Sequence, residues 1–393
     1  MTPSSRPAPG RSRWSWRSQA VRGVLYQLLA LALVILIGWW LVSNTATNMQ
    51  ARGIQSGFDF LQQPAGFDIG EPLFGYEPGQ SYFKAFLVGV GNTLRVAVIG
   101  IVLATILGTL LGIGRFSRNA LVRGFCYAYV EFFRNVPVLV QLLMWYLLAT
   151  EILPDSTAPW QFGNVFLSKG GLSFPAPVWT AGHLWMFVGL LAGIAGAWWY
   201  WHRMRREFEA TGIERNRFGL AALLVIGGGV LGWLLGGMPN EWRVPVKGEF
   251  AVEGGAALTP EFLAVLMGLV LYTAAFIAEV VRAGIASVPH GQSEAARSLG
   301  LSRSQEMRLV LLPQALRVII PPMTNQYLNL TKNSSLSVAI GYPDVVSIAN
   351  TALNQTGRAV ECIAIIMAVY LTTSLTTSVF MNWYNARAAI KER

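Results

Sequence analysis

The sequence predicts an all-α, polytopic membrane protein, and two observations carry this prediction. Of the 393 residues, 53% are hydrophobic and only 13% are charged, and the mean hydropathy is +0.45. This composition is too apolar for a soluble domain. The chain also contains several nearly charge-free apolar runs of about 20 residues, the length that a helix needs to cross a bilayer. Cys126 and Cys362 both fall in apolar surroundings, so neither a disulfide framework nor a metal site is indicated.

About eight such runs define the expected transmembrane helices. They span residues 24–42, 86–113, 135–150, 184–201, 218–238, 262–281, 316–340 and 362–383. The third run is short and the seventh is unusually polar. The first run has the length of a full span, and no A-x-A-like cleavage site follows it, so a retained helix is expected rather than a signal peptide.

The distribution of positive charge orients these helices. If the amino terminus is cytoplasmic, most of the 30 Lys and Arg residues fall in cytoplasmic gaps and both chain ends are cytoplasmic. The opposite side holds far fewer of them: Arg52, Lys84, Lys169, Arg243, Lys247, Lys332 and Arg358. The net charge of +10 is therefore explained by membrane topology, and no nucleic-acid partner is expected.

No motif for catalysis or for a cofactor is present. None of the five lysines follows a glycine, so the chain has no P-loop, and neither H-E-x-x-H nor G-x-S-x-G occurs. The chain is not expected to be an enzyme, and no catalytic or metal-binding residue is predicted. Arg95 lies close enough to the outer end of its helix to snorkel toward water, and Glu279 and Glu361 lie near helix ends, so no carboxylate relay is evident.

Small residues recur at intervals of four in two of the expected helices. Gly100, Ala104, Gly108 and Gly112 form one stripe, and Gly228, Gly232 and Gly236 form another. Such stripes allow helices to approach closely. Packing within the chain is the simpler interpretation, and contact with a second membrane subunit is the alternative.

A polar module, GQSEAARSLGLSRSQEMRLVLLP, separates two apolar runs at residues 291–313. Ser293 is expected to cap a short helix, and Gly300 to end that helix in a left-handed conformation. Ser302 and Gln305 form a capping box that opens a second short helix. Pro313 is expected to stop or kink this second helix. The module is therefore predicted to be a rigid helical hairpin outside the membrane on which another protein can dock.

The same module resembles the EAA signature of ABC importer permeases. Glu294-Ala295-Ala296 is followed, at the spacing of that signature, by Gly300 and by Val310-Leu311-Leu312-Pro313, with Val310 in place of the family's isoleucine. In that family the segment forms the coupling helix that sits in a groove of the ATPase subunit. The resemblance implies ATPase-coupling roles for Glu294, Ala295, Ala296, Gly300, Leu312 and Pro313.

Further segments resemble the polar amino acid branch of this family. They are residues 91–117, 131–146, 272–296 and 330–341, and the overall similarity covers residues 86–148 and 260–387. The additional first helix and the insertion at 151–259 make the chain most similar to the long general L-amino-acid permeases of Gram-negative bacteria. The resemblance maps the type I ABC importer core onto the second, third, sixth, seventh and eighth expected helices.

The resemblance implies a domain plan. A cytoplasmic tail (1–23), an extra transmembrane helix (24–42) and a periplasmic loop (43–85) precede the first part of the core (86–150). The inserted helix hairpin (151–259) precedes the second part (260–386), which contains the coupling loop (289–313), and a cytoplasmic tail ends the chain (387–393).

The resemblance also implies the function and the partners. The chain would be the permease subunit of an ATP-driven importer in the bacterial inner membrane, moving amino acids of the glutamate, glutamine, aspartate and asparagine type from periplasm to cytoplasm. Its partners would be an ABC ATPase dimer that binds ATP and Mg, a second homologous permease, a periplasmic amino-acid-binding protein and membrane lipid. A secondary transporter or channel for small polar solutes is the alternative, but it would leave the EAA signature without a purpose.

The polar seventh run is the expected substrate pathway. It is expected to begin at a kink at Pro321-Pro322, after which Asn325, Asn329, Lys332 and Asn333 fall on one helical face. Hydrogen bonding between helices would also explain these residues. Lys332 favours a pathway, because a cation inside a span is costly unless water or an anion meets it. The carboxylate of an amino acid would be such an anion, with Ser334 and Ser335 as hydroxyl donors. Asn333 stands where the family often has aspartate, and Asn135-Val136 where it often has Gly-Thr.

Overall fold

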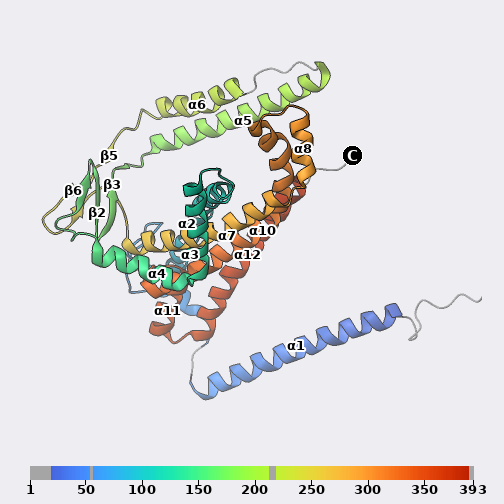
Figure 1. Ribbon diagram of the computed structural model, residues 1–393. Helices are drawn as coiled ribbons and strands as arrows, with labels where there is room; N and C mark the ends of the chain where they lie inside the picture. The colour runs from blue at the N-terminus through green and yellow to red at the C-terminus, as the bar shows by residue number, and fades with distance from the viewer. Residues whose placement is uncertain (1–18, 54–55, 212–217, 389–393) are drawn as a thin grey trace, which may run out of the picture.

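The computed structural model describes residues 19–53, 56–211 and 218–388, and most of them are helical (Figure 1). Within these ranges, six helices are long and apolar enough to cross a membrane, or up to eight if each of two bent helix pairs counts as one span. This confirms the predicted helical membrane fold. Most of both predicted tails and the turn at 212–217 lie outside the described residues.

The core is built on α2 (Tyr82–Gly114) and α7 (Pro260–Ala286), which pack closely along their length. The small residues of α2 make this approach possible. An added Cβ at Gly108 would lie 2.6 Å from Cβ of Ile277, and one at Gly112 would lie 2.8 Å from the carbonyl oxygen of Ala278. The α2 stripe therefore serves packing within the chain rather than contact with a second subunit. At one end of this pair, Arg115 donates to Glu279 across 2.5 Å.

The third expected span, 135–150, differs from the structure. Residues 120–135 form a separate helix, α3 (Ala120–Asn135), which was not expected from the sequence, and α4 begins only at Val138. The two helices meet at an angle of 103°. Pro137 explains the break, because a proline disfavours helical backbone in the residue before it, and Val136 is extended. Asn135 thus ends α3 instead of opening the span; α4 (Val138–Leu147) continues into a π-helical turn (Leu148–Ile152).

The seventh expected span also has different limits. The helix α10 runs from Leu312 to Asn333, straight through Pro321 and Pro322, and is followed by a 3-10 helix (Ser334–Ile340). It does not begin at the two prolines. After it come α11 (Val345–Thr356) and α12 (Ala359–Ala388), of which only α12 was expected from the sequence.

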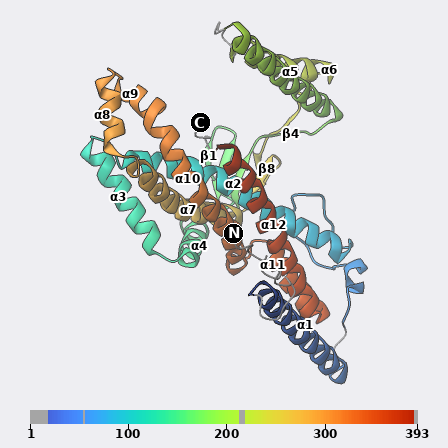
Figure 2. The ribbon, with the colours of Figure 1, turned by 90° about the vertical axis from the view of Figure 1, so that its right-hand side faces the viewer.

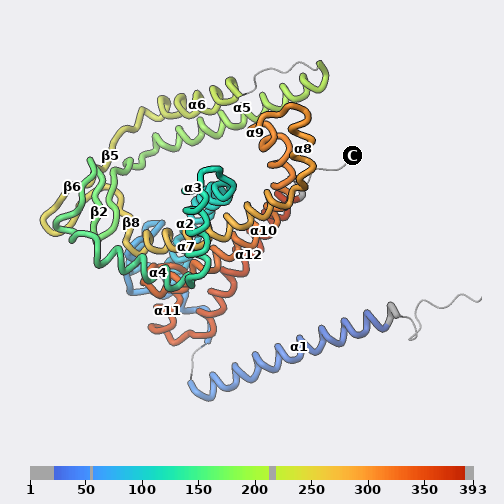
Figure 3. Tube along the Cα trace, viewed as in Figure 1, coloured from blue at the N-terminus to red at the C-terminus, as the bar shows by residue number. Residues whose placement is uncertain are grey.

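The inserted segment contains the predicted helix hairpin and strands that were not predicted. The helices α5 (Ala181–Thr211) and α6 (Phe218–Leu235) pack through glycines on both sides: an added Cβ at Gly228 would lie 2.4 Å from the Gly189 carbonyl oxygen. The second glycine stripe therefore also packs within the chain. Figure 3 shows this hairpin running from the strands along the top of the view, separate from α2 and α7.

Short antiparallel strands join the hairpin to the core. A four-stranded sheet has the order β1 (Trp160–Phe162), β2 (Val165–Ser168), β3 (Gly171–Phe174) and β8 (Ala256–Leu258). Two further pairs are β4 (Ala176–Pro177) with β5 (Trp242–Arg243), and β6 (Val246–Lys247) with β7 (Val252–Glu253). Because β3 pairs with β8, the two ends of the insertion lie on the same side of the molecule, which we call the strand end.

A folded segment caps the strand end. Residues 56–81 include a 3-10 helix (Asp59–Gln62), and Phe60, Ala65 and Ile69 are buried against α2 and α11. Glu71 accepts from Arg95 across 2.5 Å and from the Thr259 hydroxyl across 2.6 Å. Arg95 is therefore held in an ion pair and does not snorkel freely.

The remaining helix, α1 (Gln19–Ala51), lies beside the core without packing against it (Figures 1 and 2). Figure 2 shows α1 and the α5–α6 hairpin on different flanks of the core, with α3, α8 and α9 on a third. The polar module lies opposite the strand end, at what we call the α8 end.

Candidate functional site

The polar module forms a compact helical hairpin. Its first helix, α8, spans His290–Ser298 and ends in a Schellman motif, in which the Gly300 amide donates to the Arg297 carbonyl and the Leu301 amide to the Ala296 carbonyl. Gly300 has a φ of +74°, which confirms the predicted left-handed position. We call residues 289–311 the coupling hairpin.

Ser293 does not cap this helix. The helix begins three residues earlier, after Pro289, so Ser293 lies inside it and has no free N-terminal amide to accept from. Its hydroxyl instead points inward and donates to the carboxylate of Glu306. The capping assignment from the sequence is therefore wrong, because the helix start is set by the preceding proline.

The second helical segment of the hairpin confirms the predicted capping box but not the predicted role of Pro313. Ser302 and Gln305 cap each other across the start of α9 (Arg303–Gln305), as predicted. The chain then continues through a π-helical turn (Glu306–Leu311) directly into α10, with Pro313 in the first turn of α10. The helical backbone is continuous through Pro313, so this proline does not stop the helix.

The faces of α8 are clearly divided. Ser293 and Ala296 are buried, whereas Glu294, Ala295 and Gly300 are exposed. Leu299 is 80% exposed at the tip of the hairpin, although it is a large apolar residue. Among the residues singled out from the sequence, Glu294, Ala295 and Gly300 thus lie on a free surface, Ala296 packs the interior, and Leu312 and Pro313 lie at the base where the hairpin joins α10.

The polar residues of α10 lie where the helical spacing predicts. Asn325, Asn329 and Lys332 are exposed on one face, while Leu330 and Thr331 beside them are buried. A row of exposed polar side chains within a membrane helix requires contact with water or protein rather than lipid.

The side chains of the residues after Lys332 are less exposed. Asn333 is half-buried, and Ser334 is buried with its hydroxyl donating to the Thr331 carbonyl across 2.7 Å. The Ser335 hydroxyl donates to the Lys332 carbonyl, also across 2.7 Å. Both hydroxyls thus satisfy backbone groups in this structure. Among the described residues, no group of His, Cys, Asp and Glu could hold a metal ion.

Comparison with known proteins identifies the family. A family model described as the binding-protein-dependent transport system inner membrane component matches residues 218–389. The general L-amino acid transport system permease protein AapQ of Rhizobium johnstonii is 44% identical over 97% of this chain and 96% of its own. The chain belongs to the amino-acid ABC transporter permeases. The putative amino-acid ABC transporter permease protein YhdX of Escherichia coli is 45% identical over 99% of this permease and 100% of its own length.

A third relative of the permease carries a substrate in its name. The glutamate/glutamine/aspartate/asparagine transport system permease protein BztB of Rhodobacter capsulatus is 37% identical over 95% of both chains. The similarity to these three relatives thus extends over nearly the full length of each chain. Glu306 was missed, because nothing in the local sequence links it to Ser293, 13 residues earlier.

Proposed function

We propose that this permease moves polar L-amino acids of the glutamate, glutamine, aspartate and asparagine type from periplasm to cytoplasm, and that the coupling hairpin connects it to a separate ATPase. The exposed face of α8 carries this proposal, because Glu294, Ala295 and Leu299 form a free surface on a rigid hairpin continuous with α10. The substrate class rests on the likeness to the relative named for these four amino acids.

The partners follow from the same proposal. An ABC ATPase dimer binds ATP and Mg and docks on α8, a second homologous permease completes the membrane unit, and a periplasmic binding protein delivers the amino acid. This chain itself performs no catalysis and holds no cofactor.

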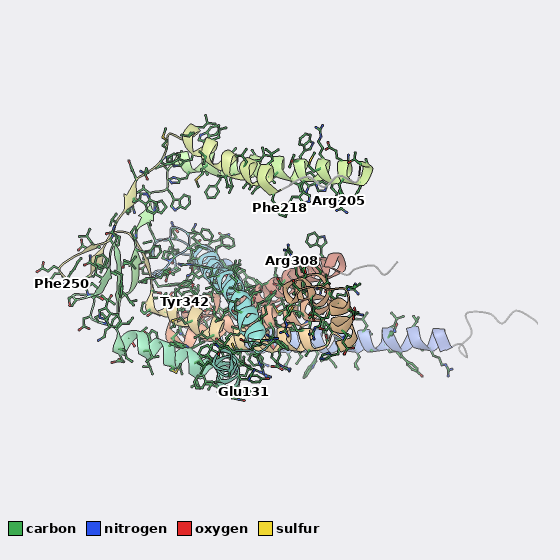
Figure 4. The ribbon with its side chains drawn as sticks, turned by 45° about the horizontal axis from the view of Figure 1, so that its top comes forward. Glu131, Arg205, Phe218, Phe250, Arg308 and Tyr342 are labelled. Atoms are coloured by element: carbon green, nitrogen blue, oxygen red, sulfur yellow. The ribbon has the colours of Figure 1, made fainter. Side chains whose placement is uncertain are left out.

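The strand end faces the periplasm and the α8 end the cytoplasm in this proposal, with both termini cytoplasmic. Contacts between distant gaps support one common side for the strand end: Glu71 with Thr259, and Asp59 with Arg358 at 3.1 Å. Figure 4 shows Phe250 at the strand end and Arg205 toward the opposite end of the hairpin, where the positive-inside rule places it.

Cysteine cross-linking tests the coupling surface. In the assembled complex, a Glu294→Cys permease is expected to cross-link to the ATPase subunit with a short reagent that carries one thiol-reactive group and one photoreactive group. Asn240→Cys is the control, because Asn240 is equally exposed but follows α6 at the strand end. Failure of position 294 to cross-link, with the complex intact, would contradict docking on α8.

The substrate pathway is proposed to follow the exposed face of α10. Lys332 is the only lysine of the predicted spans, and it is exposed beside two asparagines. A desolvated ammonium group favours an anionic partner, and the α-carboxylate common to all amino acids provides one. Asn325 and Asn329 would then offer amide groups along the path without adding charge, and Asn333, Ser334 and Ser335 form the turn that follows.

The substitution Lys332→Met tests this path. It is expected to raise the amino acid concentration for half-maximal uptake by at least tenfold in reconstituted complexes, because about 1.5–3 kcal/mol is the usual contribution of a hydrogen bond to a charged group. The matched control is Lys169→Met, since Lys169 pairs with Asp155 in the inserted segment, away from α10. Unchanged concentration dependence for Lys332→Met would make Lys332 structural.

A further inference from the structure

The coupling hairpin is closed by a buried carboxylate. Glu306 is only 4% exposed, although it lies in a hairpin outside the core. It accepts a hydrogen bond from the Ser293 hydroxyl and from Nε of Arg297, the latter across 3.2 Å. Nη2 of Arg297 also lies 3.3 Å from the Ser293 hydroxyl, so the three side chains form one cluster. Burying a carboxylate is costly unless it is paired and hydrogen-bonded in this way.

This cluster is the main polar link between α8 and the chain that leads to α10. Beside it lies a cavity of about 340 Å³, whose lining includes Phe116, Ile285, Met307 and Leu311. Because this open space lies between the hairpin and residues outside it, such as Phe116 and Ile285, apolar contact leaves part of α8 unsupported. Ser293 and Arg297 lie one turn apart on α8, so together they clamp it to a single side chain of the returning segment.

The position of Glu306 in the chain links its contact with α8 to the start of α10. Glu306 is the first residue of the π-helical turn that runs into α10. A π-helical turn is a local irregularity in a helix and often marks a functional position. Fixing Glu306 to α8 means that a displacement of α8 reaches the start of this turn directly, and from there α10, rather than being absorbed in residues 299–305, which connect α8 to Glu306 along the chain.

We propose that Glu306 is a positioning residue for coupling: clamped by Ser293 and Arg297, it makes α8 and α10 move as one body when the ATPase pushes on α8. This inference rests on the proposed function, because it requires the ATPase to dock on α8. It assigns no contact with the ATPase or the amino acid to Glu306 itself.

The charges around Glu306 predict a pH dependence. The hydrogen bonds from Ser293 and Arg297 lower the pKa of Glu306 below its ordinary value, with Arg303 adding to the effect. His290 also faces the cavity. Since the pKa is lowered on folding, the stabilisation is present above the ordinary pKa of glutamate and is lost as pH falls through the folded value. The clamp is thus closed at neutral pH.

The first test replaces Glu306 by glutamine and measures amino acid transported per ATP hydrolysed in the whole complex. Glu306→Gln is expected to lower this ratio at least fivefold while the ATPase still co-purifies with the permease. Arg308→Gln is the control, because Arg308 is exposed two residues further along the same turn (Figure 4). Arg297→Lys, which keeps the charge, is expected to retain more coupling than Arg297→Gln.

A second test separates coupling from folding. In a Ser293→Cys/Glu306→Cys permease, a short bifunctional methanethiosulfonate is expected to restore the ratio, and its removal by reductant to lower it again in the same molecules. Cys126 and Cys362 are buried and remain in place. An unchanged ratio in Glu306→Gln, or in the double variant with and without the cross-link, overturns the clamp. Cross-linking at position 294 reports docking separately, so it shows whether the proposed function fails as well.

Discussion

In the coupling hairpin, Gly300 is the residue whose backbone conformation most restricts substitution. An added Cβ there would meet no atom within 4 Å, so space is not the constraint; the φ of +74° is. Holding an ordinary residue in this left-handed conformation costs about 1–2 kcal/mol, whereas asparagine tolerates it better. Gly300→Val is therefore expected to reduce ATP-driven uptake strongly, and Gly300→Asn only slightly. Gly300→Pro should abolish it while the complex still inserts. Equal uptake for the valine and asparagine variants would contradict this role of the backbone.

Local features of single residues were readable from the sequence, and contacts across the hairpin were not. Gly300 and the pair Ser302–Gln305 were predicted correctly because a left-handed helix end and a capping box depend on neighbours within a few residues. Ser293 was assigned wrongly because the helix already starts after Pro289, which leaves Ser293 inside α8, and because its partner, Glu306, is distant in sequence. A serine near a helix start has two uses, and only the three-dimensional contact decides between them.

Pairs of helices depend on glycines at their closest approach. The contact of α2 with α7 leaves no room for a methyl group at Gly108. Gly108→Ala is expected to lower the stability of the complex by about 1–3 kcal/mol, the usual cost of overpacking. Gly124→Ala is the control: Gly124 lies in α3 with nothing within 4 Å, so the better helix former should be neutral or stabilising. The midpoint of thermal unfolding in detergent measures both, and a similar midpoint for the two variants would argue against close packing.

The existence of the long helices was predictable from the apolar runs, but the residues at which helices begin and end were not. The runs located the six long helices, yet they could not distinguish Pro137, which breaks a helix, from Pro313, through which the helical backbone continues. The strands β1 to β8 are only two to four residues long, so they carry too short an alternation to be recognised. α3 was missed because it is not apolar throughout.

The molecule as a whole is a two-part core with an insertion whose ends meet. Residues from separate gaps between the spans come together at the strand end, where β3 pairs with β8 and Thr259 donates to Glu71. The sequence predicts an insertion at 151–259, but it did not predict how this segment is attached. Thr259, its last residue, caps α7 by accepting from the Phe262 amide and also donates to Glu71, so this end of the insertion belongs structurally to the core.

That attachment defines how the α5–α6 hairpin can be removed. β4 pairs with β5 in antiparallel register, and the Val178 amide donates to the Glu241 carbonyl across 2.9 Å. Residues 179–240 can therefore be replaced by Asn-Gly, the preferred two-residue turn between antiparallel strands. Two crossings are lost together, so every later segment keeps its side of the membrane.

The shortened permease is expected to insert, to bind its ATPase and to retain most of the ATP-driven uptake, because neither the coupling hairpin nor α10 is altered. Deleting all of 151–259 with a short joiner should also spare the core fold but lower its stability further, because it removes the Thr259 cap, worth about 1 kcal/mol, and a hydrogen-bond partner of Glu71. Membrane insertion, ATPase co-purification and the thermal midpoint of both deletions decide the matter. If the Asn-Gly variant fails to insert, the hairpin is needed to fold the core and is not a separable module.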